Sequence, residues 1–390
     1  MKRFSQIRLA LCMFPLVAAI AAANYEPKTI EQGAVAPDFS LKGTDDKLYT
    51  LQDLKGEKAT VIIFTTNHCP DAIAGIGRTK ALVEHFEGKG VGVFAINSNS
   101  PEGLHLRELA FSVYDDSFED MKKLVVSSEL NYPYLYDGDT QEVAKAYGAV
   151  ATPHAFVFDA DLKLCYNGRL DNGRRSIGPT DKNETRDAVE AVLKGEVPAV
   201  VKTRPIGCST KWKEKAGAVA VQDKKWAEQP VTVETIDAET VGKLARNKGR
   251  EGMRLINVWS TTCGPCVMEF PELSRIYRRF TFHDFELITI SLDPPSDSEK
   301  VKTFLEENEC GLGGRTANLV KKDGRTTNNY IFDGDTEDLA KALDSEWNGA
   351  MPHTLFVGAD GEVVYRHTGI IDAEKLKKVV VDYIWASMEE

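Results

Sequence analysis

The sequence predicts an α/β protein made of two tandem copies of one domain. Short apolar runs alternate with amphipathic stretches along the chain, which is the order expected of βαβ units. In each half a buried strand leads directly to a Cys at the start of a helix, first at Cys69 and then at Cys263. Segments downstream of these Cys residues also recur, which indicates an internal repeat. The recurring pairs are Asp137-Gly138-Asp139-Thr140 with Asp333-Gly334-Asp335-Thr336, and Thr152-Pro153-His154 with Met351-Pro352-His353.

Length and composition fit two soluble domains. The chain has 390 residues, of which 42% are hydrophobic and 27% charged, as in ordinary globular proteins. The net charge of −11 argues against nucleic acid as a partner. Seven Cys are too few for a disulfide scaffold of this size, so each thiol is considered first for reactivity.

The N-terminus has the pattern of a secretory signal peptide. A basic start, Met1-Lys2-Arg3, precedes an apolar run over 9–23 that ends in three Ala. This run is shorter than the roughly 20 residues needed to span a membrane. We expect residues 1–23, including Cys12, to be removed, leaving an exported, soluble protein of a bacterial periplasm.

The first domain is expected over residues 27–197. Its elements follow from apolar runs that alternate with amphipathic ones, closed by a hairpin after Pro153. The expected strands cover 60–64, 90–97, 132–136, 155–158 and 163–166, and the expected helices cover 117–130 and 140–147, with a further helix starting at Cys69.

Cys69 is placed for reactivity, because a helix N-terminus favours the thiolate. The segment Thr66-Asn67-His68-Cys69-Pro70 and the domain's opening resemble peroxiredoxins and the AhpC/TSA-like redoxin domains of exported bacterial proteins. The resemblance implies that the Thr66 hydroxyl helps to hold the thiolate and a peroxide. Ile62 replaces the Pro usual in peroxiredoxins, and Ala72 stands where a second local Cys would be.

Residues 198–230 form a basic tail and linker between the domains. The run Arg204–Lys213 resembles the tail of the same redoxin-like domains, which carries a Gly-Cys before a Lys-Trp. We expect this tail to pack on the first domain, followed by a flexible segment over 214–229. Cys208 in the tail is our first candidate for resolving Cys69, and Cys165 is the second, although a Cys in such a strand is more often a core residue.

The second domain, residues 231–390, contains the strongest motif, Cys263-Gly264-Pro265-Cys266. It lies between an apolar strand over 255–259 and a helix over 266–280 with one apolar face. Cys263 at the helix N-terminus favours a thiolate, and the two-residue gap that Gly264 and Pro265 fill allows a small disulfide. A thiolate with a neighbouring thiol can perform disulfide exchange. Strands at 285–292 and 329–332 and helices at 298–308 and from Thr336 complete the domain.

The run Trp259–Cys266 resembles the active site of the thioredoxin superfamily, most closely the exported TlpA/ResA-like thiol-disulfide oxidoreductases. The resemblance implies two tandem thioredoxin-fold domains, each a central mixed sheet flanked by helices. It implies that Glu269 handles a proton, since Asn257 stands where thioredoxins proper carry a buried Asp. Pro352 is the candidate cis-Pro beside the thiols, and Pro153 is its counterpart in the first domain.

The function expected from these residues is that of an exported thiol-disulfide oxidoreductase, and of a reductant rather than an oxidant. Its cofactor would be the redox-active disulfide Cys263–Cys266 alone, and its substrates disulfides of other proteins. By resemblance, a DsbD/CcdA-like membrane thiol reductase would supply electrons. The first domain either reduces peroxides through Cys69, fed with electrons by the second domain of the same chain, or is a binding module without turnover that presents substrates to the second domain.

Other ligands and thiols leave alternatives open. A zinc site needs four ligands, and no second Cys pair or spaced His pair follows the motif; no metal is expected. Met351 and His353 with the Cys pair could bind Cu(I), which is the alternative of an SCO-like copper-handling protein. His154 and His353 are expected to line groove walls, and Cys310 to be structural or free.

Overall fold

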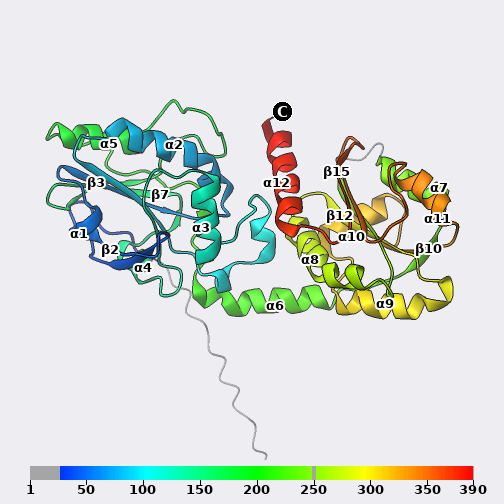
Figure 1. The fold of residues 1–390 in the computed structure, drawn as a ribbon. Helices are drawn as coiled ribbons and strands as arrows, with labels where there is room; N and C mark the ends of the chain where they lie inside the picture. The colour runs from blue at the N-terminus through cyan, green and yellow to red at the C-terminus, as the bar shows by residue number, and fades with distance from the viewer. Residues whose placement is uncertain (1–26, 248–251, 390) are drawn as a thin grey trace, which may run out of the picture.

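A computed structural model describes residues 27–247 and 252–389 and shows two α/β domains side by side (Figure 1). The expected signal peptide and Cys12 lie outside the described residues. The two domains confirm the predicted tandem architecture.

In the first domain the elements are β1 (Ser40–Gly43), β2 (Leu48–Thr50), α1 (Leu51–Leu54), β3 (Ala59–Thr65), α2 (Pro70–Phe86), β4 (Val91–Asn97), η1 (Pro101–Gly103), η2 (Leu106–Leu109), α3 (Phe118–Ser127), β5 (Tyr134–Tyr136), α4 (Glu142–Tyr147), β6 (Ala151–Thr152), β7 (His154–Asp159), β8 (Leu164–Gly168) and α5 (Glu184–Leu193). The tail and linker contain β9 (Cys208–Ser209), η3 (Lys213–Lys215) and α6 (Ala216–Ala227). The second domain comprises β10 (Glu234–Ile236), α7 (Ala238–Arg246), β11 (Met253–Trp259), α8 (Gly264–Phe280), β12 (Phe285–Ser291), η4 (Pro295–Asp297), α9 (Ser298–Glu307), α10 (Gly314–Lys322), β13 (Asn329–Phe332), α11 (Thr336–Leu343), β14 (His353–Val357), β15 (Val363–Thr368) and α12 (Ala373–Glu389).

The two main sheets share one plan. The first has the strand order β2-β1-β5-β4-β3-β7-β8 and the second β10-β13-β12-β11-β14-β15. In both, a parallel centre (β3, β4, β5 or β11, β12, β13) is extended by an antiparallel hairpin. Phe64 of β3 pairs with His154 of β7, and Val258 of β11 pairs with His353 of β14. The loop that carries each reactive Cys therefore lies beside the Pro that precedes β7 or β14.

Helices cover both faces of the central strands, which explains why those strands are largely apolar. In β3, Ile62 and Phe64 belong to one core cluster, while Val61 and Ile63 belong to the cluster that includes α2 and α5 side chains. In β11 the same alternation directs Leu255 toward α8 and α12, and Ile256 and Val258 toward α7 and α11. Both Cys-bearing loops thus leave a strand that is buried on both faces over nearly its whole length.

The linker is helical, so the expectation of a flexible segment over 214–229 was wrong. Most of it forms α6, which lies along the lower edge of the molecule and reaches from the first domain to the second (Figure 1). The segment is rich in Ala, the best helix former. The C-terminal end of α6 is fixed by Trp226. The Trp226 and Tyr277 rings pack with their centroids 5.3 Å apart, and the Trp226 indole N–H donates to the carbonyl of Glu309 at 3.2 Å.

The domains also meet directly. The buried guanidinium of Arg279, near the end of α8, donates to three carbonyl oxygens between Leu109 and Val113, two of them at 3.1 Å. The Trp385 indole N–H donates to the carbonyl of Phe111 at 3.0 Å. These contacts and α6 hold the end of α8 against the η2 region.

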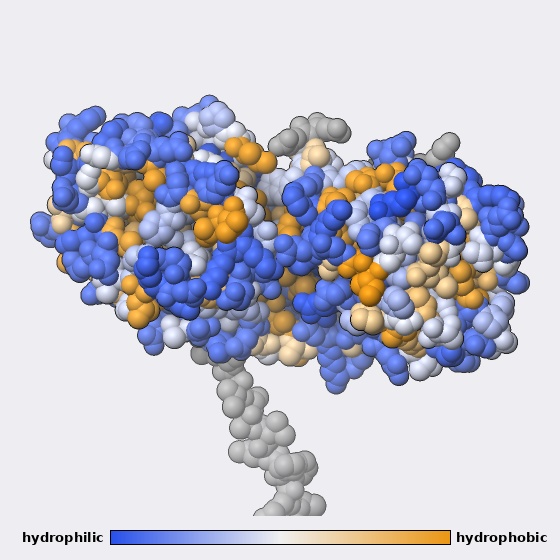
Figure 2. Space-filling view, viewed as in Figure 1, coloured by the Kyte–Doolittle hydropathy of each residue, from blue (hydrophilic) through white to orange (hydrophobic). Residues whose placement is uncertain are grey.

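The surface is mostly hydrophilic on the face shown in Figure 2, with small separate hydrophobic patches. Among the described residues, no helix combines the length and apolarity required to cross a membrane.

Candidate active sites in the two domains

Cys263 and Cys266 form a disulfide at the start of α8. Cys263 is the N-cap residue, and its Sγ accepts the backbone N–H of Cys266 at 3.3 Å. Cys263 is partly exposed, whereas Cys266 is fully buried. The arrangement therefore offers one sulfur to an external partner and keeps the second behind it.

Gly264 and Pro265 occupy the first positions of α8, where Pro fits because its missing N–H has no helical partner. A Cβ added at Gly264 would meet open space within 4 Å. No packing inside the chain demands glycine there, and the bare backbone beside Cys263 is open to a partner.

Glu269 lies one turn beyond Cys266 on the same side of α8. Its side chain is buried, and its two oxygens accept hydrogen bonds from the Ile371 N–H and the Asn257 amide, both at 2.9 Å. Burial raises the pKa of Glu269 to about 7, although these two hydrogen bonds act in the opposite direction. A carboxyl group with that pKa can exchange a proton near neutral pH.

Pro352 follows Met351 through a cis peptide bond, as proposed from the sequence. Because Val258 pairs with His353, Pro352 lies next to the end of β11 from which the Cys263 loop departs. Trp259 is not in the groove: its ring is fully buried against Phe270, with centroids 4.5 Å apart. Trp259 supports the site from the core.

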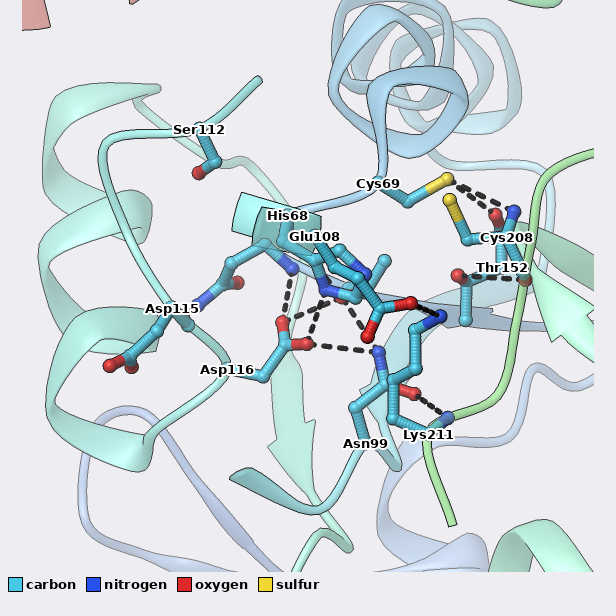
Figure 3. Close-up of polar contacts among 12 residues, drawn as sticks. His68, Cys69, Asn99, Glu108, Ser112, Asp115, Asp116, Thr152, Cys208 and Lys211 are labelled. Carbon is cyan, nitrogen blue, oxygen red and sulfur yellow. Dashed lines mark hydrogen bonds and ion pairs between the residues drawn. The ribbon is translucent and has the colours of Figure 1, made fainter. Parts of the chain in front are cut away.

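In the first domain, Cys69 caps the N-terminus of α2 and is fully buried. Its Sγ lies 3.1 Å from the carbonyl oxygen of Thr152 and accepts the Cys208 N–H at 3.2 Å (Figure 3). The Thr152–Pro153 peptide bond is cis. This domain therefore repeats the relation between Cys263 and Pro352.

The tail brings Cys208 to Cys69. Strand β9 pairs with β6, which sets Cys208 opposite Thr152. Burial alone would raise the pKa of Cys69, but hydrogen bonds from the Cys208 thiol and from the Ala72 and Cys208 amides lower it below its ordinary value. Its hydrogen bond to Cys69, together with burial, raises the pKa of Cys208. Cys69 is thus the thiolate of this pair and Cys208 its thiol partner.

A buried polar network lies behind Cys69 (Figure 3). The Asp116 carboxylate contacts His68 Nδ1 and the Thr66 hydroxyl, both at 2.6 Å, and accepts the Asn99 amide at 2.9 Å. Burial raises the pKa of Asp116, but the charge and hydrogen bond of His68 and the hydrogen bonds of Thr66 and Asn99 lower it to about 2. The partners of the Thr66 hydroxyl are His68, Asp116 and Asn99, and not Cys69.

Asp116 and Asn99 were not anticipated from the sequence. They lie in loops 30 or more residues beyond Cys69, so only the fold brings them to it. The one local signal is the polar run from Asn97 to Ser100, which begins at the last residue of β4.

The remaining candidates lie away from the sulfurs or inside the core. Cys165 is partly exposed on β8, and its Sγ contacts the Lys163 carbonyl at 3.4 Å. Cys310 is buried, which raises its pKa to about 12. The structure therefore brings Cys208, rather than Cys165, to Cys69.

Neither His lines an open groove. His154 is buried, and burial lowers its pKa to about 3. Both ring nitrogens of the buried His353 are engaged, by Thr368 at 2.9 Å and Asp344 at 3.2 Å. His353 is therefore not available as a Cu(I) ligand. Over residues 27–247 and 252–389, no group of three or more His, Cys, Asp or Glu could hold a metal ion.

A sequence profile of the AhpC/TSA family matches the chain twice, over residues 32–167 and 229–366. The chain belongs to the AhpC/TSA family. Both domains match, so this membership confirms the predicted tandem of redoxin-like domains. As an AhpC/TSA protein with a Cys263–Cys266 disulfide, it is a redoxin-type oxidoreductase.

Three solved structures that are similar to this AhpC/TSA protein each match less than half of it. An uncharacterized conserved protein from Geobacillus kaustophilus is 40% identical, covering 49% of this chain and 94% of its own, with a TM-score of 0.42. A hypothetical protein from Sinorhizobium meliloti is 33% identical, with 47% and 96% covered and a TM-score of 0.42. Peroxidoxin BcpB from Mycobacterium tuberculosis is 17% identical, with 43% and 97% covered and a TM-score of 0.31.

Proposed function

We propose that the protein is an exported thiol-disulfide oxidoreductase of TlpA-like type that reduces disulfides in other proteins through Cys263 and Cys266. The observation that carries this proposal is the disulfide at the start of α8, with one sulfur accessible and the other buried. The apolar leader over 9–23 supports export.

The reaction starts from the reduced pair. The Cys263 thiolate attacks a substrate disulfide, and one substrate sulfur leaves as a thiolate that takes up a proton. Cys266 then loses its proton to Glu269, directly or through water, and attacks Cys263. The second substrate thiol is released, and the two electrons have passed from the protein dithiol to the substrate.

The surroundings of the disulfide fit a polypeptide substrate. Val267 and Met268 on the first turn of α8 are 38% and 71% exposed, and Ile370 is 46% exposed. Apolar side chains beside a reactive sulfur favour contact with an exposed chain segment. Pro352 has no N–H of its own, which leaves the neighbouring backbone free to pair with that segment.

The direction is reduction, because the Gly-Pro dipeptide between the thiols is that of thioredoxin, a reductant. A reductant outside the cytoplasm needs electrons from across the membrane. A DsbD/CcdA-like membrane thiol reductase is the proposed donor.

Trapping tests this function. A Cys266→Ser variant, expressed with its leader, should accumulate mixed disulfides between Cys263 and substrate proteins, detectable by mass spectrometry after non-reducing electrophoresis. The Cys263→Ser/Cys266→Ser variant is the control and should trap nothing. If both variants show the same adducts, or none, Cys263 does not exchange with protein disulfides.

A second activity is favoured by the Cys69–Cys208 contact. We propose that Cys69 reduces peroxides: its thiolate attacks one peroxide oxygen, an alcohol or water leaves, and the resulting sulfenic acid condenses with Cys208 to a disulfide and water. Stopped-flow measurement should show peroxide consumption that Cys69→Ser abolishes, and Cys208→Ser should leave the sulfenic acid unresolved. If wild type consumes no peroxide, the first domain is the binding module considered above.

A further inference from the structure

A cavity of about 510 Å³ lies beside Cys208, between the domains. It is lined by His68 in the loop before α2, by the tail with Cys208, by α6 and by Phe282 just beyond α8. Cys69 itself does not line it. The sulfur that a bound molecule would meet is therefore that of Cys208.

The lining is cationic in an acidic protein. Arg107, Arg175, Lys211 and Lys215 face the cavity, against the single carboxylate of Glu108, in a chain of net charge −11. Glu108 pairs with Lys211 at 2.5 Å. Over the described ranges 27–247 and 252–389, no carboxylate partner is found for the other three cations.

The two arginines among these three cations have only weak or neutral contacts. The Arg107 guanidinium donates to the Gln222 amide oxygen at 3.4 Å, and the Arg175 guanidinium lies 5.1 Å from the centre of the Phe111 ring. Three such cations around one cavity create a positive potential that attracts anions.

His68 provides a second, independent indication of a ligand. Its ring is 1% exposed, and Asp116 fixes its Nδ1 at 2.6 Å. Its Nε2 has no hydrogen-bond partner among the described residues, although His68 lines the cavity. Buried polar atoms normally have a partner, so a bound ligand would satisfy this nitrogen.

The size and position of the cavity narrow the choice of ligand. Its volume is in the range of small-molecule sites. Phe282 lies past the C-terminal end of α8, whereas Cys263 precedes its N-terminus, and a helix of 17 residues is about 25 Å long. The second domain therefore meets this cavity with the end of α8 remote from its thiols.

We propose that this interdomain cavity binds a small thiol that carries a carboxylate, and that this thiol reduces the Cys69–Cys208 disulfide. The inference rests on the proposed Cys69/Cys208 couple and names its reductant. The cations would hold the carboxylate while the thiolate attacks the accessible sulfur of Cys208.

Reduction of the Cys69–Cys208 disulfide by this thiol takes two steps. The ligand thiolate attacks Cys208 Sγ, and Cys69 leaves as a thiolate that the Ala72 and Cys208 amides stabilise. A second ligand thiolate attacks the ligand sulfur of the mixed disulfide, and Cys208 leaves and takes up a proton. Two thiols are oxidised to one small disulfide, and the protein disulfide is reduced to a dithiol.

The test uses the full mature chain with Cys263→Ser/Cys266→Ser, so that only the first domain reacts. The protein is oxidised with diamide, and formation of Cys69–Cys208 is checked by mass spectrometry. Its reduction by 3-mercaptopropionate, an anion, is then compared with reduction by neutral 2-mercaptoethanol, as rates per thiolate. We expect the anion to react about tenfold faster or more, with an advantage that shrinks as salt is added.

Matched variants test whether the cavity cations cause the faster reaction of the anionic thiol. Arg175→Gln/Lys215→Gln should abolish the preference for 3-mercaptopropionate over 2-mercaptoethanol. Lys224→Gln, on the same helix as the cavity wall but outside the lining, should preserve the preference. Equal rates for the two thiols, or a preference that the double variant retains, would overturn the cavity assignment alone. Failure of diamide to form Cys69–Cys208 would overturn the proposed couple as well.

Discussion

Single residues decide which sulfurs react. Cys69 and Cys310 are both buried, yet burial raises the pKa of Cys310 to about 12, whereas the pKa of Cys69 is lowered. The difference is the set of donors around Cys69: the Cys208 thiol and two backbone amides. Position at a helix N-terminus was readable from the sequence, but the decisive donor, Cys208, comes from 139 residues away.

Glu269 gives a prediction about pH. With its pKa raised to about 7, Glu269 becomes a base as pH rises through 7, and attack by Cys266 should accelerate over the same range. Glu269→Gln should remove this inflection and slow closure of the Cys263–Cys266 disulfide by about 100-fold or more. Rapid-quench alkylation between pH 5 and 9 measures the rate. Glu272→Gln, exposed on the next turn, is the control, and an inflection that survives in Glu269→Gln would exclude this role.

Asp116 gives a prediction about stability. The pKa of Asp116 is lowered to about 2, against about 3.9 in an unfolded chain, so its contribution is present above about pH 4 and is lost as pH falls through 2. Asp116→Asn should destabilise the first domain at pH 7 by roughly 2 to 4 kcal/mol, and by less at pH 2.

Denaturant unfolding of the first domain at the two pH values measures this difference. Asp115→Asn is the control, because the hydrogen bond that the Asp115 carboxylate accepts from the Ser117 N–H, at 2.8 Å, lies near the surface; its cost should stay below about 1 kcal/mol. An equal loss in the two variants would show that the buried network is not specific to Asp116.

At the scale of elements, the sequence predicted those that periodicity and apolar runs mark strongly. Strands β3, β4, β11 and β12, and helices α3, α8 and α9, were expected within a few residues of their observed bounds. Helices α5, α10 and α12 were not anticipated. The four-residue core of the second site, from Cys263 to Cys266, was readable because its parts are adjacent in sequence.

The prediction of a flexible segment over 214–229 was wrong because tertiary packing determines the structure of the linker. Basic charge and sequence position suggested a flexible segment, whereas Trp226 packs on Tyr277 and anchors the helix. The polar network of Asp116 was missed for a similar reason, since its partners come from separate loops. Local pattern does not encode such contacts.

Helix α6 gives a prediction about domain coupling. Val221 lies in the middle of α6 and is 54% exposed, so Val221→Pro would break the helix, at about 3 kcal/mol, without disturbing a core. We expect faster limited proteolysis between residues 213 and 229 and a broader interdomain distance distribution by small-angle scattering. Val221→Ala should match wild type. Unchanged proteolysis in Val221→Pro would show that the helix does not couple the domains.

The whole molecule combines two thiol pairs on one repeated scaffold. In the second domain both thiols lie within one helical turn, whereas in the first the partner thiol arrives on the tail. The length of α8, about 25 Å, separates the Cys263–Cys266 pair from the interdomain cavity. Arg279 fixes the end of α8 that is remote from this pair to the first domain. Thiol exchange requires sulfur contact, so we expect each pair to exchange with a partner of its own.

Disulfide mapping of the oxidised mature protein tests this central claim most directly. Mass spectrometry of peptides from protein oxidised with diamide and alkylated should find Cys263 joined to Cys266 and Cys69 joined to Cys208, with Cys165 and Cys310 alkylated as free thiols. Both bonds should open with dithiothreitol. A Cys69 that stays free, or that pairs with Cys165 or Cys310, would contradict the account.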